Sequence, residues 1–420
     1  FKLTNGQVDA IDIIKGSFIL QSPSKVLIQG DVGCGKTIVA IIACFHAIAN
    51  NHQCLVLVPT EVLCNQHFYT FKKYLHSYGV VEMISGKTSD QDRTLIKSKI
   101  ARGEISVLVG THALLFNDYC FKSLALVIID EQHKFGVKQR EKITSSYKKQ
   151  PHLIYMSATP IPRTLGLVLY ESMNYITIED KPSNRQLIET IVIDDKQRDK
   201  IVSSVSNHLK NKMQVYWVCT RVEDTLDDDV QSVKIFSDSI KKLFPNHSVS
   251  VLHGKLSSEK KIKIIEDFKH AKIDILVTTS VIEVGVDCPN ANCLVVENSE
   301  LFGLAQLHQL RGRVGRGETQ GFCYLVHSPR TKNDSIEKLK YLEAHHSGFD
   351  VAEYDLKLRG TGTYLGNKQS GMPDNYRISN INDIMDNITY IKSFEYEFPS
   401  SKIRELKKRW NIKKANEIQL

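Results

Sequence analysis

Short apolar runs alternate along the chain with longer segments whose apolar residues recur at helical spacing. A continuous apolar run is typical of a strand in a parallel sheet, because helices cover both faces of such a sheet. Strands that alternate with helices predict right-handed crossovers and an α/β fold. In the first part of the chain we expect strands at 26–28, 54–58, 80–84, 105–110, 125–129 and 152–156, and helices at 62–76 and 90–101.

Turn-forming residues interrupt this pattern at 180–184, and a second alternating series follows. Its expected strands are 214–219, 248–252, 274–279, 293–297 and 322–326, with a helix at 259–270. We therefore predict two tandem parallel-sheet domains, separated where the turn formers cluster. The expected domains are 1–182, 183–335 and a small, mostly helical C-terminal segment at 336–420 with a basic tail.

The first strand leads into Gly30-Asp31-Val32-Gly33-Cys34-Gly35-Lys36-Thr37, which has the spacing G-x-x-x-x-G-K-[ST] between a strand and a helix. Glycines let the backbone N–H groups of such a P-loop converge on a phosphate beside the positive end of a helix. We expect all eight residues to bind ATP, with Lys36 also catalytic at the β- and γ-phosphates and the Thr37 hydroxyl on Mg²⁺. The alternative is a glycine-rich turn with a solvated lysine.

A pair of adjacent carboxylates, Asp130 and Glu131, directly follows the apolar run at 125–129. Two carboxylates after a buried strand are costly to place without a cation or another partner. We expect Asp130 to hold the Mg²⁺ shell and Glu131 to orient and deprotonate the attacking water as a catalytic residue. An exposed acidic helix cap is the alternative interpretation.

The second series contains no further P-loop, so we expect it to act on the nucleotide held by the first domain. Its segment 309–316 carries Arg311, Arg313 and Arg316 among glycines. Arginine makes bidentate, always-charged contacts to phosphate, so these side chains would complete the site when the two domains close. Arg313 and Arg316 are the expected catalytic arginines, and a solvated basic loop is the alternative.

Small polar residues stand near the carboxyl ends of several expected strands, where ligands of open α/β sheets bind. Thr60 and Thr111 could contact the phosphates of a DNA strand or cap the helices that follow. Ser157 and Thr159 suit a hydrogen-bonded relay between the nucleotide and a second site. Gln7, upstream of the P-loop strand, either reads the adenine edge of ATP or is a surface glutamine in a helix.

Composition bounds the class of protein and of partner. The 420 residues are 42% hydrophobic and 24% charged, as in ordinary globular proteins, and no apolar run approaches the roughly 18 residues of a membrane span. The net charge of +8 favours a polyanionic partner. Nine cysteines without a C-x-x-C pair indicate reduced thiols and a cytoplasmic location. Because the chain begins at Phe1 rather than Met, we expect a fragment of a longer protein.

Together these segments resemble the core of a superfamily 2 helicase and, more closely, the RecG family of branched-DNA helicases. The resemblance implies two RecA-like domains, ATP and Mg²⁺ as cofactors, and ATP-driven remodelling of stalled forks and Holliday junctions with 3′→5′ polarity. It implies double-stranded and branched DNA, and other replication or repair proteins, as partners. The matching text is GDVGCGKT (30–37), GTHALL (110–115), DEQHKFGVKQR (130–140), SATPIPRTL (157–165), YWVCT (216–220), TSVIEVGVDCPNA (279–291) and GLAQLHQLRGRVGRG (303–317).

Two C-terminal stretches, 349–360 and 365–371, resemble the helical hairpin and loop that couple ATP hydrolysis to DNA translocation in this family. Further expected roles follow the matched motifs. The expected coupling residues are Gln132, His133, Ser157, Thr159, Arg359 and Gln369, the further ATP-binding residues are Gly285 and Asp287, and the DNA-binding residues are Thr60, Thr111 and Thr279.

The sequence departs from the family pattern at three places: Cys34 replaces a usual serine, Lys338 an arginine, and Thr361-Gly362-Thr363 a Pro-Gly-Glu. Lysine lacks the bidentate fork of arginine, which puts the efficiency of coupling in question. The N-terminal wedge domain of the family has no match in these residues. Two alternatives therefore stay open: a transcription-repair coupling translocase, and a DNA-binding remnant without turnover.

Overall fold

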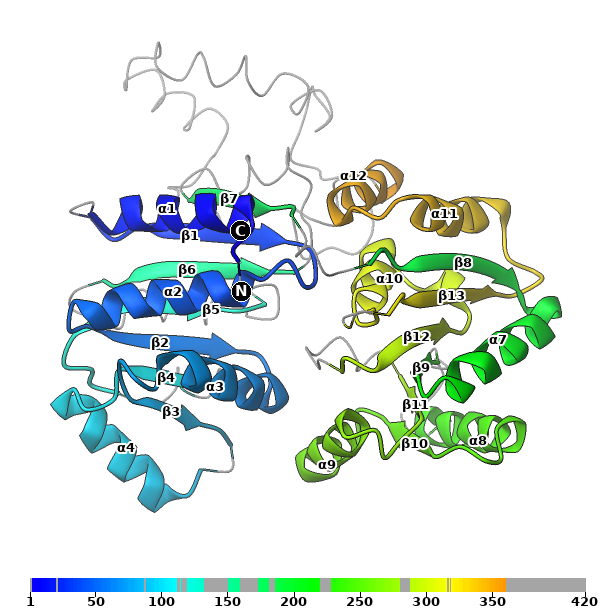
Figure 1. Ribbon diagram of the computed structural model, residues 1–420, viewed down its shortest axis with the longest axis horizontal. Helices are drawn as coiled ribbons and strands as arrows, with labels where there is room; N and C mark the ends of the chain where they lie inside the picture. Colours follow the sequence, from blue (N-terminus) through cyan, green and yellow to red (C-terminus); the bar gives the residue numbers. More distant parts are fainter. Residues whose placement is uncertain are drawn as a thin grey trace, which may run out of the picture.

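The computed structural model describes residues 2–19, 22–86, 88–111, 114, 119–131, 150–158, 173–180, 186–219, 228–279, 288–315, 317 and 319–359. These residues form two β-sheets that lie side by side, with helices packed against them (Figure 1). Every strand pairing that the structure describes is parallel. The arrowheads of β1 and β2 in Figure 1 point toward the second domain, so the carboxyl edge of the first sheet faces it.

The first sheet has seven strands in the order β3-β4-β2-β5-β6-β1-β7. This order gathers the carboxyl ends of β5, β6 and β1 at neighbouring points of one edge. The strands are β1 Lys25–Gly30, β2 Gln53–Val58, β3 Val81–Ile84, β4 Val107–Thr111, β5 Leu124–Ile129, β6 His152–Ser157 and β7 Asn174–Ile178. The helices are α1 Asn5–Ile19, α2 Lys36–Ala49, α3 Glu61–Leu75 and α4 Asp90–Arg102.

The second sheet has six strands in the order β10-β11-β9-β12-β13-β8. Its strands are β8 Glu189–Asp194, β9 Gln214–Val218, β10 Val249–Leu252, β11 Ile275–Thr278, β12 Ala291–Val296 and β13 Phe322–His327. Its helices are α7 Arg198–Lys210, α8 Asp228–Leu243, α9 Ser258–Lys269 and α10 Leu304–Arg311, with short 3₁₀ turns η3 Asp195–Gln197 and η5 Ser299–Leu301.

Apolar side chains bury both faces of each sheet, as their continuous apolar runs predict. All six residues of β2 and all six of β12 are buried. A buried polar group in the second core is fully paired: the Glu297 carboxylate accepts from the indole N–H of Trp217 over 2.9 Å and from both terminal nitrogens of Arg198 over 3.0 and 2.7 Å. Such pairing is what makes a buried carboxylate tolerable.

Two helices, α11 Asn333–Ala344 and α12 Gly348–Arg359, form a hairpin beside β8 and α10. The aromatic ring of Tyr341 stacks on His345 and on Tyr354, with centroids 3.8 and 3.7 Å apart, so the rings join the two helices. Glu343 accepts from the backbone N–H of Val192 over 2.8 Å, which fixes α11 to the edge strand β8. The hairpin is thus anchored to the second domain.

The α/β class with two parallel sheets and a helical C-terminal part is confirmed, and the predicted strands lie within a few residues of those observed. We missed α1 and two edge strands, β7 and β8, whose burial is partial and therefore gives no continuous apolar run. The first sheet ends at Ile178 and the second begins at Glu189. Most of the predicted boundary at 180–184 lies outside the described residues, so the domain limits stay predictions.

Candidate nucleotide site and interdomain interface

The loop between β1 and α2 has the strand–turn–helix context that a P-loop requires. Gly35 caps the amino end of α2 with a φ of 86°, a left-handed conformation that residues with a Cβ adopt only at a cost. The helix begins at Lys36, so the unpaired N–H groups of its first turn, which includes Thr37, face the loop. The expected nucleotide-binding residues from Gly30 to Thr37 therefore form one continuous turn.

The ammonium group of Lys36 hydrogen-bonds to its own loop. Its Nζ donates to the carbonyl oxygens of Gly30 and Asp31 over 2.6 and 3.0 Å, and the Cys34 sulfur lies 3.8 Å away. Cys34 is fully buried, where a small thiol packs like an apolar side chain. The cysteine thus fits the loop that the sequence motif defines.

Gln7 lies on α1 and is only 4% exposed, so the surface-glutamine alternative is wrong. Its Nε2 donates to the carbonyl oxygen of Cys34 over 2.8 Å, and its Oε1 accepts from the N–H of Thr4 over 3.1 Å. The side-chain amide therefore contacts the P-loop directly. A contact of Gln7 with the adenine edge of ATP stays a prediction.

Asp130 follows β5 and sits near Lys36. Its Oδ1 accepts from the N–H of Glu131 over 2.9 Å, and its Oδ2 lies 2.8 Å from Nε2 of His67 on α3. Burial pushes the pKa of Asp130 upward, but the hydrogen bond and charge of His67, the charge of Lys36 and the Glu131 N–H together lower it below its ordinary value. The carboxylate is therefore kept ionised, as a cation ligand needs.

Glu131 is half-buried and has a φ of 51°. A positive φ is uncommon for a residue with a side chain, and such strain is concentrated at functional sites. Ser157 is buried at the end of β6, next to β1 in the sheet. The exposed-cap alternative for the carboxylate pair does not fit these positions.

The three threonines expected at DNA lie at or just beyond strand ends. Thr60 caps α3, where its side chain accepts from the N–H of Leu63, so the capping alternative is confirmed for this residue. Thr111 ends β4 and Thr279 follows β11, and both are buried. A DNA contact of these residues stays a prediction.

The second domain meets the P-loop through α10. The imidazole Nε2 of His308 is hydrogen-bonded to Oδ1 of Asp31. One turn further along, a Cβ added to Gly312 would lie 2.7 Å from Cβ of Val32, so only glycine lets the loop approach this closely. Asp31, Val32, His308 and Gly312 are among the residues that line a narrow cavity of about 20 Å³ between the domains. On α3, Val62 also packs against the core of the second domain.

Arg311, which we expected beside the other arginines at the phosphates, is hydrogen-bonded to the α11–α12 hairpin, and its contact with phosphate stays a prediction. It is 3% exposed, and its guanidinium donates to the carbonyl oxygens of Leu342 and His345 over 2.7 and 2.9 Å. Its Nη2 lies 2.8 Å from Nδ1 of His308. Arg313 is also buried, at 4% exposure, directly after α10.

The model of the DEAD/DEAH box helicase family matches residues 4–168, and that of the helicase conserved C-terminal domain matches 196–318. The ATP-dependent DNA helicase RecG of Haemophilus influenzae is 40% identical over 386 residues, 91% of this chain and 56% of the relative. RecG of Bacillus subtilis is 40% identical over 378 residues, 89% of this chain and 55% of the relative.

A solved structure of RecG bound to a three-way DNA junction superposes with a TM-score of 0.76 at 34% identity. The superposition covers 93% of this chain and 50% of the RecG chain in that structure. Over about nine tenths of its length the chain is therefore similar to RecG helicases. It spans about half the length of the RecG relatives it matches.

Several RecG-like positions of the sequence fall outside the described residues. They are Gln132, His133, Thr159, Gly285, Asp287, Arg316, Gln369 and 361–363. Arg359 ends α12, but its side chain is outside the description. Lys338, where a RecG arginine is usual, donates from Nζ to the carbonyl oxygen of Phe302 over 3.1 Å and so still joins α11 to the segment before α10.

Two histidines that contact candidate site residues had no role expected from the sequence. His67 lies on the buried face of α3 together with Leu63 and Phe71, and a histidine on such an apolar face was the available signal. His308 lies inside the matching text 303–317, where only the arginines had an expected role. Both side chains contact residues that the motifs did single out.

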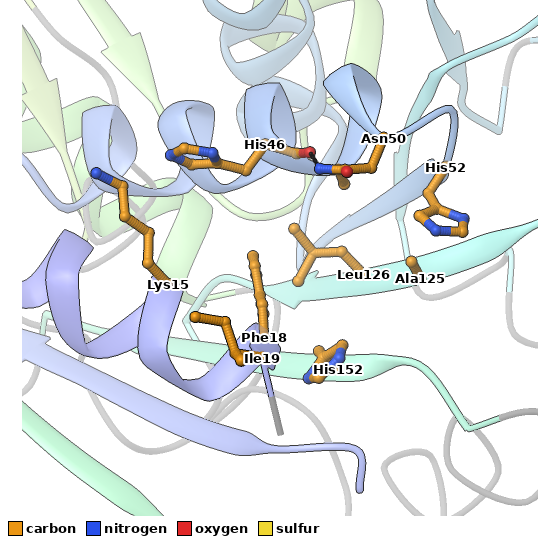
Figure 2. Close-up of a pocket in the computed structure, with 10 residues that line it drawn as sticks. Lys15, Phe18, Ile19, His46, Asn50, His52, Ala125, Leu126 and His152 are labelled. Carbon is orange, nitrogen blue, oxygen red and sulfur yellow. Dashed lines mark hydrogen bonds between the residues drawn. The ribbon is translucent and has the colours of Figure 1, made fainter. Parts of the chain in front are cut away.

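A larger hollow of about 460 Å³ lies elsewhere on the first RecG-like domain (Figure 2). It opens at the amino ends of β5 and β6, opposite the edge that carries the P-loop. His46, His52 and His152 lie around its wall without converging on one point. Among the described residues, no three His, Cys, Asp or Glu side chains could hold a metal ion, and no helix is long and apolar enough to cross a membrane.

Proposed function

We propose that this chain is the ATP-driven motor of a DNA helicase that remodels branched DNA, such as stalled forks and Holliday junctions. One observation supports the proposal: the P-loop lies near the Asp130 carboxylate through Lys36, and the same loop is contacted by α10 of the second parallel-sheet domain through His308 and Gly312. The names of the relatives support ATP-dependent DNA unwinding, and the RecG structure on a three-way junction supports a branched substrate.

The site residues divide by chemistry. The Thr37 hydroxyl and the Asp130 carboxylate would hold Mg²⁺, because this hard cation prefers oxygen ligands and Asp130 is kept ionised. Lys36 would contact the β- and γ-phosphates of ATP, and Glu131 would deprotonate the attacking water. Arg313 and Arg316 would stabilise charge on the γ-phosphate when the domains close. The metal supplies further neutralisation of phosphate charge when bound.

The DNA path would run across the carboxyl ends of the strands, where Thr60, Thr111 and Thr279 stand. A net charge of +8 favours the phosphate backbone as a partner. The hairpin of α11 and α12, with Arg359 and Gln369, would turn domain closure into 3′→5′ movement along DNA. A cytoplasmic location and contacts with other repair proteins belong to the same proposal.

The test measures ATP hydrolysis and junction unwinding by the full-length protein, with and without forked DNA. We expect forked DNA to stimulate hydrolysis, and Glu131→Gln to lower the rate by at least about a hundredfold while ATP still binds. Glu104→Gln changes an exposed carboxylate of the same domain and should leave the rate near that of the wild type.

Two results would contradict the proposal. Hydrolysis that forked DNA does not stimulate would favour the DNA-binding remnant, and hydrolysis that survives Glu131→Gln would remove its catalytic role. Junctions with a block on one arm test polarity. Movement with 3′→5′ polarity would meet the block and stop, whereas movement in the opposite direction would not.

A further inference from the structure

Hydrogen bonds join the P-loop to the α11–α12 hairpin through the side chains of two domains. Lys36 Nζ donates to the Asp31 carbonyl oxygen over 3.0 Å, and the Asp31 carboxylate bonds Nε2 of His308. Nδ1 of His308 lies 2.8 Å from Nη2 of Arg311. Arg311 in turn donates to carbonyl oxygens at the carboxyl end of α11. The path is continuous from the nucleotide loop to the hairpin.

The chemistry of the partners fixes the state of His308. A guanidinium has donors only, so Nδ1 of His308 must offer its lone pair to Arg311. The proton then resides on Nε2, which donates to the Asp31 carboxylate. Asp31, His308 and Arg311 are 6%, 3% and 3% exposed. Because all three are buried, losing either bond leaves a buried polar group without that partner.

The same part of the P-loop also has a steric contact with α10. Val32, next to Asp31, faces Gly312, where an added Cβ would lie 2.7 Å from the Val32 Cβ. Adjacent loop residues thus make a polar and an apolar contact one helical turn apart. Both contacts depend on the present conformation of the loop backbone at 31–32.

We propose that His308 is a positioning residue that ties the conformation of the P-loop to the position of the α11–α12 hairpin. A phosphate ligand that attracts Lys36 removes the bond between Lys36 and the Asp31 carbonyl oxygen. The loop backbone can then shift, and His308 passes the shift to Arg311, which is bound to the hairpin. The mechanical output rests on the proposed helicase function, whereas the coupling between loop and hairpin does not.

The first experiment therefore needs nucleotide but no DNA. Amide hydrogen exchange of the full-length protein is measured with and without the non-hydrolysable ATP analogue AMP-PNP and Mg²⁺. We expect the analogue to change exchange at 339–346 in the wild type and in His308→Gln, whose amide can accept from Arg311 and donate to Asp31. His308→Met should abolish that change, while exchange within α2 still responds to the analogue.

The second experiment measures ATP consumed per forked DNA unwound. We expect His308→Met to raise this ratio by about tenfold, within the usual range of coupling between two sites, and His308→Gln to restore it. Gly312→Ala should raise it as well, because the added methyl group displaces Val32 without touching the hydrogen bonds. His270→Met, at an exposed histidine of the same domain, is the matched control.

The outcomes separate this proposal from the proposed function. A hairpin response to AMP-PNP that survives both His308→Met and Gly312→Ala overturns the inference. A His308→Gln protein as defective as His308→Met also overturns it, because shape rather than hydrogen bonding would then matter. If the wild-type hairpin responds but forked DNA is not unwound, the helicase assignment fails and the coupling stands.

Discussion

The side-chain amide of Gln7 donates to the carbonyl oxygen of Cys34 over 2.8 Å and so ties α1 to the P-loop. The contact is possible because the next residue, Gly35, has no side chain: a Cβ there would lie 2.2 Å from Nε2 of Gln7. The helix that precedes the first strand is therefore part of the candidate nucleotide site, although nothing in the P-loop motif itself requires it.

Replacing Gly35 by alanine tests this relationship. We expect Gly35→Ala to lower the free energy of unfolding by roughly 1–2 kcal/mol from its left-handed backbone alone, and the clash with Gln7 adds to that. The affinity for ATP should fall by at least about tenfold, measured by titration with a fluorescent analogue.

Gly16 is the matched control for that variant. It is exposed on α1, and an added Cβ would meet no atom within 4 Å. Gly16→Ala should raise the free energy of unfolding by roughly 0.5–1 kcal/mol, because alanine loses less backbone entropy in a helix. Unchanged nucleotide affinity in Gly35→Ala would refute the assigned geometry.

The buried Glu297 carboxylate predicts a large loss of stability on truncation. Glu297→Ala leaves the Trp217 N–H and the Arg198 guanidinium without their shared acceptor. We therefore expect the free energy of unfolding to fall by about 3–5 kcal/mol. Urea denaturation measures the change. The exposed Glu337→Ala should stay within about 0.5 kcal/mol of the wild type, and a similar small loss for Glu297→Ala would count against the description of this core.

His208 predicts a dependence of stability on pH. Burial lowers its pKa below the ordinary 6.5, beside Tyr324 and the ring of Phe322. As pH falls through 6.5 the unfolded chain binds a proton that the folded chain does not, so the folded state loses stability. The stabilising contribution is complete above 6.5 and is lost below it.

The measurement compares the wild type with His208→Gln by urea denaturation at about pH 8 and about pH 5.5. The wild type should lose stability relative to the variant at the lower pH. His76→Gln, at an exposed histidine, is the control for general acid effects. A difference between wild type and His208→Gln that does not change with pH would contradict the predicted direction.

The thiols predict a simple labelling pattern. All nine cysteines are free, and Cys120 alone is exposed. Burial raises the pKa of Cys64 and of Cys323 to about 12, so these thiols hold almost no reactive thiolate near neutral pH. We expect one rapidly reacting thiol in the native protein, none in Cys120→Ser and the remainder only after unfolding. A second rapid thiol would place one of the buried cysteines at the surface.

The sequence predicted the strands that are buried on both faces and the motifs at their carboxyl ends. It did so because a continuous apolar run and a glycine-rich loop leave local signals. β7 and β8 escaped because their side chains are only partly buried, and α1 because its apolar face is narrow. Those elements depend on neighbours that are distant along the chain.

The cross-domain contacts were out of reach for a different reason. Arg311 and Arg313 are two residues apart and chemically identical, so the sequence gives no reason to expect different partners for them. In the structure a carboxyl end of α11 offers carbonyl oxygens to Arg311, and this long-range partner decides its direction. His67 and His308 likewise acquire meaning only from Asp130 and Asp31, which no spacing rule connects to them.

Because Lys36 already bonds two carbonyl oxygens of its loop, any anion enters this site by exchange. The entering group must replace hydrogen bonds to a charged donor, each worth about 1.5–3 kcal/mol. Chloride or bicarbonate offers too little in return, whereas a polyphosphate chain offers several oxygens together with the N–H groups of α2. The loop therefore favours a ligand that makes many contacts at once over one that makes few.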